Sequence, residues 1–336
     1  MNMQIETLRG LACLLLVIYH VVGADASLGL QVADGPLRWL TDGMAYLRMP
    51  LFTFLSGLVY GLRPFGGNSR AFLSGKARRL LVPMLVVGTT FAALQAVTPG
   101  TNFSAGPWYL WHVQPIAHFW FVESLFWVFV LVWALERAAL LKNGQGFAVV
   151  FALAGALYLS VRGWHWFGIE GAIYLLPYFL AGLAATRFSL RVPLAKPWVK
   201  GVLLVCAVGA VVWIGVPVSN PDRRTVWMLL SGLSLCLLCL SFGWANRHLA
   251  RIGRHSYAIY LFHVFFTAAS RIALDRLQLD AMLIQLAVGV ALGLVGPMWV
   301  EQLASRFKWT AVLLLGKSPR RRAGVDAKLP QLVPAN

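Results

Sequence analysis

Residues 8–20 read LRGLACLLLVIYH, an apolar run that has an arginine, Arg9, near its start and a histidine, His20, at its end. With its flanks this run is long enough for a membrane-spanning helix, which needs about 20 mostly apolar residues. Runs of this kind recur along the chain of 336 residues, which is 59% hydrophobic and 12% charged and has a mean hydropathy of +0.70. The sequence therefore predicts an all-α, polytopic integral membrane protein.

The apolar runs predict about ten transmembrane helices. Most of the 29 Lys and Arg residues lie in alternate connections and near the C-terminus, and this bias puts both termini in the cytoplasm. The net charge of +17 is thus a topology signal, and no nucleic acid partner is expected. Residues 1–305 are expected to form one membrane domain, and residues 306–336 a basic, disordered cytoplasmic tail. The helices are expected at residues 7–24, 44–62, 80–98, 118–136, 147–162, 169–186, 201–218, 225–243, 256–275 and 281–303.

Arg9 and His20 are eleven residues apart, which at about 100° per residue puts them on nearly the same helix face. Along the axis they are about 16 Å apart, with Arg9 at the cytoplasmic edge and His20 well inside the membrane. Ionisable side chains are costly there, so each is a candidate for function. The fork of Arg9 suits a phosphate or carboxylate, and the imidazole of His20 suits a general base. The alternatives are a snorkelling anchor for Arg9 and a hydrogen-bonded packing residue for His20.

Two other predicted helices carry polar groups near the outer side. Arg48 lies on the outer approach to the second helix, and Ser56, in the sequence LSG, lies deeper. Ser56 either lines a pore or belongs to a helix-packing pair. Glu123 lies about 6 Å inside the fourth helix, at a depth close to that of Arg48. An ion pair between Arg48 and Glu123, functional or purely structural, is therefore expected.

The predicted helix at residues 256–275 carries a second membrane histidine. His263 lies about 10 Å from the cytoplasmic end, so it can approach the depth of His20 from another helix. Tyr257 and Tyr260 are three residues apart on one side of the same helix. A functional role and a packing role for His263 are both open, and the tyrosines also fit interfacial or packing positions.

Two polar connections are candidates for substrate binding. The inner connection FLSGKARRLLVP has Lys76, Arg78 and Arg79 before Pro83 at a helix start, where they would attract a phosphorylated donor or lipid headgroups. The outer connection at residues 99–117 is uncharged and rich in aromatic residues, which suit either sugar rings or an interfacial aromatic belt. Its candidates are Trp108, Tyr109, Trp111, His112 and Gln114.

Five segments match, in order, the pattern of one family. They are LRGLACLLLVIYH, FTFLSG, ARRLLVP, FWFVESLFW and HSYAIYLFH, and they extend over nearly the whole chain. On these segments the chain resembles the acyltransferase 3 family of polytopic membrane acyltransferases. The resemblance implies transfer of an acyl group, usually acetyl, from cytoplasmic acyl-CoA to a hydroxyl of an extracytoplasmic carbohydrate such as an exopolysaccharide, lipopolysaccharide or glucan. It also implies the inner membrane of a bacterium.

Carried over residue by residue, the resemblance implies that Arg9, Arg78 and Arg79 engage the phosphates of acyl-CoA. It makes His20 the catalytic group, either as base for the acceptor hydroxyl or as transient acyl carrier. Lys76 departs from the family pattern, in which an arginine is common at this position. The candidate catalytic residues are His20, Glu123 and His263, and the candidate substrate- or donor-binding residues are Arg9, Arg48, Ser56, Arg78, Arg79 and Tyr260.

A proton-coupled membrane transporter of a small solute or glycan precursor is the alternative, because a proton relay needs the same buried His, Arg and Glu residues. Paired broken helices, which a transporter built from inverted repeats would show, are not found in the sequence. The four cysteines fall within predicted helices, so neither a disulfide framework nor a metal site is expected. The expected partners are acyl-CoA as donor substrate, a hydroxyl-bearing acceptor and the bilayer, with no bound cofactor.

Overall fold

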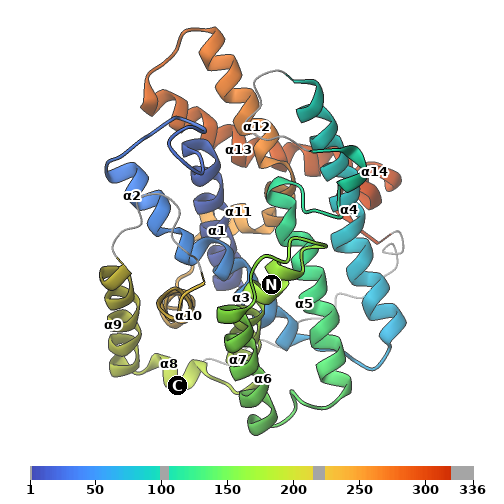
Figure 1. The fold of residues 1–336 in the computed structure, drawn as a ribbon, viewed down its shortest axis with the longest axis vertical. Helices are drawn as coiled ribbons and strands as arrows, with labels where there is room; N and C mark the ends of the chain where they lie inside the picture. The colour runs from blue at the N-terminus through green and yellow to red at the C-terminus, as the bar shows by residue number, and fades with distance from the viewer. Residues whose placement is uncertain (1, 99–105, 215–223, 319–336) are drawn as a thin grey trace.

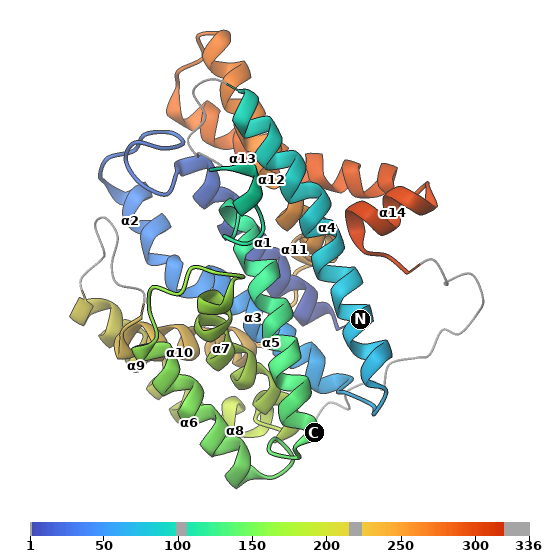
Figure 2. The ribbon, with the colours of Figure 1, turned by 45° about the vertical axis from the view of Figure 1, so that its right-hand side comes forward.

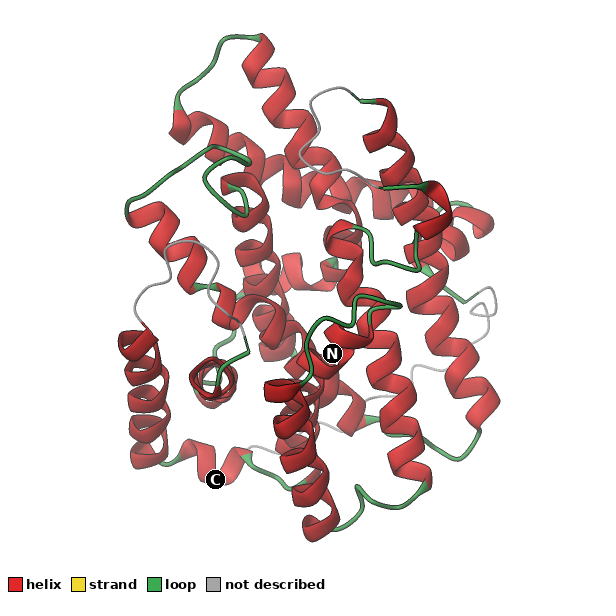
Figure 3. Ribbon diagram, viewed as in Figure 1, coloured by secondary structure: helices red, strands yellow, loops and turns green. Residues whose placement is uncertain are grey.

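Helices form every regular element in the part of the chain that the computed structural model describes, residues 2–98, 106–214 and 224–318, and no β-strand occurs there (Figures 1 and 3). The all-α prediction is therefore confirmed, and each expected apolar run has a helix. In chain order these are α1 (Met3–Val22), α3 (Ala45–Leu62), α4 (Ser69–Val97), α5 (Trp120–Arg137), α6 (Gly144–Ser160), α7 (Ile169–Arg187), α9 (Pro197–Ile214), α10 (Val226–Ser241), α12 (Ser256–Arg276) and α13 (Met282–Ala304).

Six helical segments are long and apolar enough to cross a membrane, judged by length and composition. They are α1, α4, α5 with the short turn before it, α7, α12 and α13. Three shorter apolar helices, α6, α9 and α10, accompany them. This set of helices indicates an integral membrane protein. α1 packs against α3, α11, α12 and α13, so that Arg9 and His20 lie toward opposite ends of a helix inside the bundle.

The basic connection expected before residue 80 is part of a helix, so the expected helix start at Pro83 is wrong. α4 begins at Ser69, where the side chain of Asn68 accepts a hydrogen bond from a main-chain amide of the first turn. Its 29 residues span roughly 43 Å, more than the thickness of a hydrocarbon core. Hydropathy shows where apolar residues stop, whereas Lys, Arg and Ala continue a helix readily. The basic residues on this helix are Arg70, Lys76, Arg78 and Arg79.

Several short elements were not expected from the sequence. One of them, α14, lies in the segment predicted to be disordered, so that prediction is wrong for residues 308–315. α14 packs against α4 and α13 (Figure 2), and Gly316 after it lies against the backbone of Arg79. The rest of the expected tail, residues 319–336, lies outside the described residues. The additional elements are α2 (Pro36–Gly43), α8 (Arg191–Ala195), α11 (Arg247–Arg254), α14 (Lys308–Leu315) and two 3-10 turns, η1 (Trp108–Leu110) and η2 (Ala117–Phe119).

α1 and α11 cross at two glycines, Gly10 and Gly253. A Cβ atom on Gly10 would come within 1.9 Å of the Leu249 carbonyl oxygen, and one on Gly253 within 1.9 Å of the Glu6 carbonyl oxygen. These distances are far inside van der Waals contact, so only residues without a side chain allow the two backbones to approach this closely. The crossing holds α11 against the Arg9 end of α1.

Gly253→Ala is expected to lower the thermal unfolding midpoint of the purified protein by several degrees. The new methyl group must push α11 away from α1, and overpacking of this kind costs about 1–3 kcal/mol. Circular dichroism during heating in detergent measures the effect. Gly75→Ala on α4 is the matched control, because a Cβ there meets nothing within 4 Å and alanine favours a helix. An unchanged midpoint for Gly253→Ala would contradict so close a crossing.

Candidate functional site

Three histidines from three elements meet at the C-terminal end of α1, which we call the His20 side. His20 is in the last turn of α1, His118 is in η2 and His263 is in α12. The ring centroids of His20 and His263 are 4.7 Å apart, those of His118 and His263 5.0 Å, and those of His20 and His118 5.9 Å. Among the described residues, no group of three has the arrangement needed to hold a metal ion. The predicted approach of His263 to His20 is confirmed.

The ring of His263 is held by its own helix. Its Nδ1 atom lies 2.8 Å from the Ile259 carbonyl oxygen and 2.9 Å from that of Tyr260, so we assign the ring proton to Nδ1, which donates it. Nε2 of the neutral ring is then an acceptor, and it is buried without a hydrogen-bond partner in the described part of the chain. A buried acceptor without a partner is costly, so this atom marks a place where a donor is expected to bind during function.

His118 belongs to the cluster but was not predicted from the sequence. It is buried, and its backbone carbonyl accepts a hydrogen bond from the hydroxyl of Tyr260. Neither of its ring nitrogens makes a hydrogen bond within the described residues. Tyr260, predicted to bind substrate, therefore also braces His118. The sequence signal for His118 is a histidine at the start of an apolar run, two residues before Trp120, and this pattern is too common to single it out.

A cavity of about 530 Å³ adjoins the histidines, and we call it the first cavity. His20, His118 and Tyr260 line it together with Arg48 from α3. Residues 23–24 and 28–30, in the connection from α1 to α2, form another part of its wall. The volume is within the range of roughly 300–1,000 Å³ that small-molecule sites occupy. The first cavity is therefore large enough for a substrate group next to His20.

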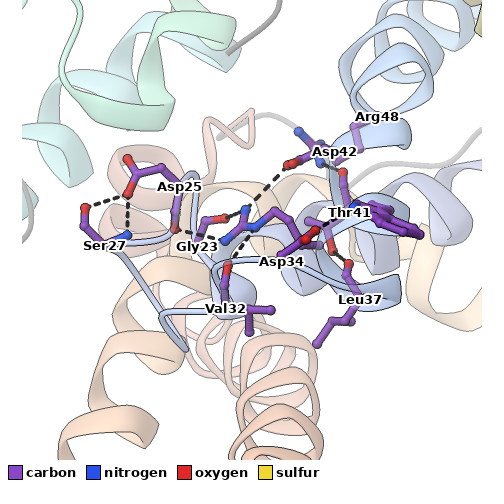
Figure 4. Close-up of polar contacts among 11 residues, drawn as sticks. Gly23, Asp25, Ser27, Val32, Asp34, Leu37, Thr41, Asp42 and Arg48 are labelled. Atoms are coloured by element: carbon purple, nitrogen blue, oxygen red, sulfur yellow. Dashed lines mark hydrogen bonds and ion pairs between the residues drawn. The ribbon is translucent and has the colours of Figure 1, made fainter. Parts of the chain in front are cut away.

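Arg38 in α2 holds the connection from α1 to α2 in place, and its partners Gly23, Asp25 and Val32 are labelled in Figure 4. Its buried side chain donates to the carbonyl oxygens of Gly23 at 2.8 Å, Asp25 at 2.9 Å and Val32 at 3.0 Å. Hydrogen bonds from the hydroxyl and amide of Ser27 hold the pKa of the Asp25 carboxyl below its ordinary value, so this carboxylate is charged at neutral pH. One wall of the first cavity is thus fixed by hydrogen bonds to the main chain.

Arg48 and Glu123 do not form the ion pair expected from the sequence. The Arg48 guanidinium carbon lies 3.7 Å from the ring centroid of Tyr19, and Nη1 donates to the Thr41 carbonyl oxygen at 2.7 Å. Glu123 is buried, and its carboxylate makes no hydrogen bond or ion pair with the described residues. Its side chain lies beside Gly168 at the start of α7. Equal depth did not bring the two groups together, because packing turns their helices toward different neighbours.

Ser56 lies where α3 crosses α7. Its hydroxyl donates to the Phe52 carbonyl oxygen of the same helix at 2.8 Å. A Cβ atom on the neighbouring Gly57 would come within 2.0 Å of the Phe179 carbonyl oxygen in α7, so the backbones are in close contact there. Ser56 is not among the residues that line the first cavity. Of the two alternatives for Ser56, the structure supports the helix-packing pair.

The opposite end of α1, which we call the Arg9 side, brings together basic residues from α1 and α4. Arg9 makes an ion pair with Glu6 at 3.2 Å, and Arg79 is close enough for its charge to act on Arg9. Arg78 donates to the Gly316 carbonyl oxygen at 3.4 Å. The three predicted donor-binding arginines therefore lie on one side of the bundle, about 16 Å along α1 from the histidines.

A second cavity, of about 710 Å³, adjoins the first on the His20 side. Arg48, Met49, Ala117 and Trp120 line both cavities, so the two share a wall. Ser124, in the second turn of α5, lines the second cavity and donates to the Gly168 carbonyl oxygen at 2.7 Å. The polar and aromatic residues of its lining include Gln114, Trp164, His165, Glu170, Tyr174 and Arg224.

The aromatic connection, which suits either sugar rings or an interfacial belt, lies only partly at this cavity. Residues 99–105 lie outside the described part of the chain. Trp108 and Tyr109 are 77% and 63% exposed, which suits an interfacial aromatic belt. Gln114 lines the second cavity, whereas His112 pairs with Thr89 and lines neither cavity. Of the candidates in this connection, only Gln114 lines the cavity, and the aromatic rings that line it come from other segments.

A family model described as an acyltransferase domain matches residues 2–302, nearly the whole chain. No curated protein and no solved structure matches the chain. The matched residues include both ends of α1, all three histidines and the lining of both cavities. The geometry described above therefore lies within the matched domain.

Proposed function

The chain belongs to the acyltransferase 3 family of membrane acyltransferases, and from this we propose that it is an O-acyltransferase. The donor in this proposal is cytoplasmic acyl-CoA, most simply acetyl-CoA. The acceptor is a hydroxyl of an extracytoplasmic carbohydrate such as an exopolysaccharide, lipopolysaccharide or glucan. The observation that carries the proposal is the position of His20, which lies at a cavity and beside the unpartnered Nε2 of His263.

In the proposed reaction the acyl group crosses a bacterial inner membrane from the cytoplasm to the outer side. The Arg9 side faces the cytoplasm, in keeping with the distribution of Lys and Arg, and the His20 side faces outward. Arg9, Arg78 and Arg79 hold the phosphates of acyl-CoA, because guanidinium groups pair with phosphate oxygens through charge-assisted hydrogen bonds. The acyl-bearing arm then extends along α1 toward the histidines.

His20 has two possible roles at the reacting atoms. As a base, it takes the proton of the acceptor hydroxyl while that oxygen attacks the thioester carbonyl carbon; the C–S bond breaks and the CoA sulfur takes up the proton. As a carrier, its ring nitrogen attacks the thioester carbonyl carbon, the C–S bond breaks and the CoA thiolate leaves. The acceptor hydroxyl oxygen then attacks the acyl carbon, the C–N bond to the ring breaks, and the hydroxyl proton passes through the ring nitrogen to the CoA sulfur. In both cases we propose that His263 Nε2, which has no partner among the described residues, accepts the ring N–H of the neighbouring His20 during the reaction and orients it. No step is assigned to Glu123, which makes no hydrogen bond or ion pair with the described residues.

Inverted membrane vesicles test this function. Their cytoplasmic face is turned outward, so radiolabelled acetyl-CoA is added outside and candidate polysaccharides are enclosed within. We expect covalent label on an enclosed carbohydrate only when the chain is present. A proton-coupled transporter would instead give solute flux without covalent label. Absence of transfer with acetyl-, succinyl- and other short acyl-CoA donors across the polysaccharides would contradict the proposal.

Arg78→Gln and Arg79→Gln are each expected to raise the apparent KM for acyl-CoA about tenfold and to leave kcat nearly unchanged. Each exchange removes a charge-assisted hydrogen bond to a phosphate, worth about 1.5–3 kcal/mol, at a distance from the reacting atoms. Initial rates at varied acyl-CoA concentration measure the effect. Arg70→Gln, in the first turn of the same helix, is the matched control. A fall in kcat at constant KM would show that these arginines do not hold the donor.

A further inference from the structure

The second cavity combines flat aromatic rings with hydrogen-bonding groups. Trp120, Trp164 and Tyr174 supply the rings, and Gln114 and Glu170 supply an amide and a carboxylate. Trp164 is 57% exposed, so it lies at the mouth of the cavity, whereas Trp120 belongs to the wall shared with the first cavity. The cavity therefore extends from an exposed tryptophan to the wall that separates it from His20.

Arg224 and Glu170 form an ion pair in this cavity, and the other arginine of its lining, Arg48 in the shared wall, stacks on Tyr19 and donates to the Thr41 carbonyl oxygen. Arg224 Nη2 lies 3.2 Å from Glu170 Oε1 and donates to the Glu170 carbonyl oxygen at 2.7 Å. Nη1 of the same arginine donates to the Val161 carbonyl oxygen. His165 Nδ1 lies 3.5 Å from Glu170 Oε2. These contacts hold the Glu170 carboxylate in place, and its Oε2 atom makes no hydrogen bond within the described residues. A ligand rich in hydroxyl groups can donate a hydrogen bond to this oxygen.

We propose that the second cavity binds a neutral sugar ring of the acceptor. A pyranose ring has faces of C–H bonds that pack on aromatic rings, and a rim of hydroxyls that pair with amide and carboxylate groups. Trp164 and Tyr174 supply the stacking faces, and Gln114 and Glu170 pair with the hydroxyls. The hydroxyl to be acylated then lies at the lining shared by the two cavities, beside the first cavity that His20 lines. This assignment rests on the proposed function, because it names the acceptor subsite of that reaction.

Two other occupants suit the cavity less well. A lipid acyl chain would cover the Gln114 amide and Glu170 Oε2 without supplying hydrogen bonds, and buried polar groups without partners are costly. The phosphates of acyl-CoA would face the Glu170 carboxylate. The basic residues suited to those phosphates lie on the Arg9 side, at the opposite end of α1. The carbohydrate acceptor is therefore the occupant that the lining favours.

A binding measurement tests the assignment without relying on catalysis. The full-length protein in detergent is titrated by calorimetry with three neutral probes of different linkage: maltotetraose, cellotetraose and laminaritetraose. We expect at least one probe to bind, and Trp164→Ala to weaken that binding at least tenfold. Trp166→Ala is the matched control, because Trp166 is similarly exposed, at 44%, yet does not line the cavity. No binding by any probe, or equal weakening by both variants, would overturn the assignment.

A kinetic measurement separates this assignment from the proposed function. With the acceptor identified in the vesicle assay, Trp164→Ala is expected to raise the acceptor KM at least tenfold and to leave the acyl-CoA KM unchanged. Probe binding without any acyl transfer would support the sugar-binding cavity and remove the proposed function. Acyl transfer with an acceptor KM unaffected by Trp164→Ala would keep the function and overturn the cavity assignment.

Discussion

His20→Ala is expected to lower the rate of acyl transfer at least about 10³-fold while the protein remains folded. General bases contribute roughly 10²–10⁴-fold, and loss of a covalent acyl carrier would remove the reaction path altogether. The side chain is only partly buried, at the wall of the first cavity, so its loss should cost little stability. Transfer from radiolabelled acetyl-CoA in inverted vesicles measures the rate, and thermal unfolding of the purified variant measures the stability.

His112→Ala is the matched control for this exchange. His112 Nε2 lies 2.9 Å from Thr89 Oγ1, and His112 is not among the residues lining the two cavities. Burial lowers the pKa of His112, so that its ring is neutral at pH 7 and no charge is removed with it. This variant should keep its activity within about twofold. Normal transfer by His20→Ala would exclude the histidine cluster as the reaction centre.

His263→Asn is expected to lower kcat about 10²-fold with little change in the acyl-CoA KM. The asparagine amide N–H₂ can replace Nδ1–H as donor to the Ile259 carbonyl oxygen, but nothing replaces Nε2, the acceptor beside His20. A base whose ring is no longer oriented loses much of its efficiency. Because His263 acts through His20, it is a positioning residue in this mechanism. Initial rates at varied donor concentration separate kcat from KM.

His263→Gln provides the comparison that a purely structural role would not explain. The longer side chain places an amide oxygen nearer to the position of Nε2 and removes the side-chain hydrogen bond to the Ile259 carbonyl oxygen. We therefore expect His263→Gln to retain more activity than His263→Asn, although it is the less stable of the two in thermal unfolding. Activity that simply follows the unfolding midpoint in both variants would contradict the positioning role.

The sequence was most informative along α1, where the relevant geometry is local. Eleven residues within one helix determine that Arg9 and His20 lie on nearly one face and about 16 Å apart. The apolar runs likewise predicted the long helices, because burial in lipid requires them. The predicted start of α4 was wrong, because the prediction used hydropathy alone. The helix begins where helix propensity and the Asn68 cap allow it to begin.

The rest of the site depends on contacts between residues far apart in the chain. His118 joins His20 only because η2 packs beside α12, and no local pattern encodes that packing. The rotation of α3 and α5 about their own axes decided that Arg48 stacks on Tyr19 and not against Glu123. The second cavity takes its rings from α5, α7 and the connection before α7, a combination that only the folded chain reveals.

The hydrogen bonds of Arg38 determine which parts of the site are free to diverge in evolution. Every acceptor on the connection from α1 to α2 is a main-chain carbonyl, at Gly23, Asp25 and Val32, and such a carbonyl is present whatever the side chain. Exchanges at Ala24 and Leu28 can therefore reshape the wall of the first cavity without removing these bonds. Sequence changes in this short connection can thus alter the shape of the first cavity and leave in place the hydrogen bonds that position it beside His20.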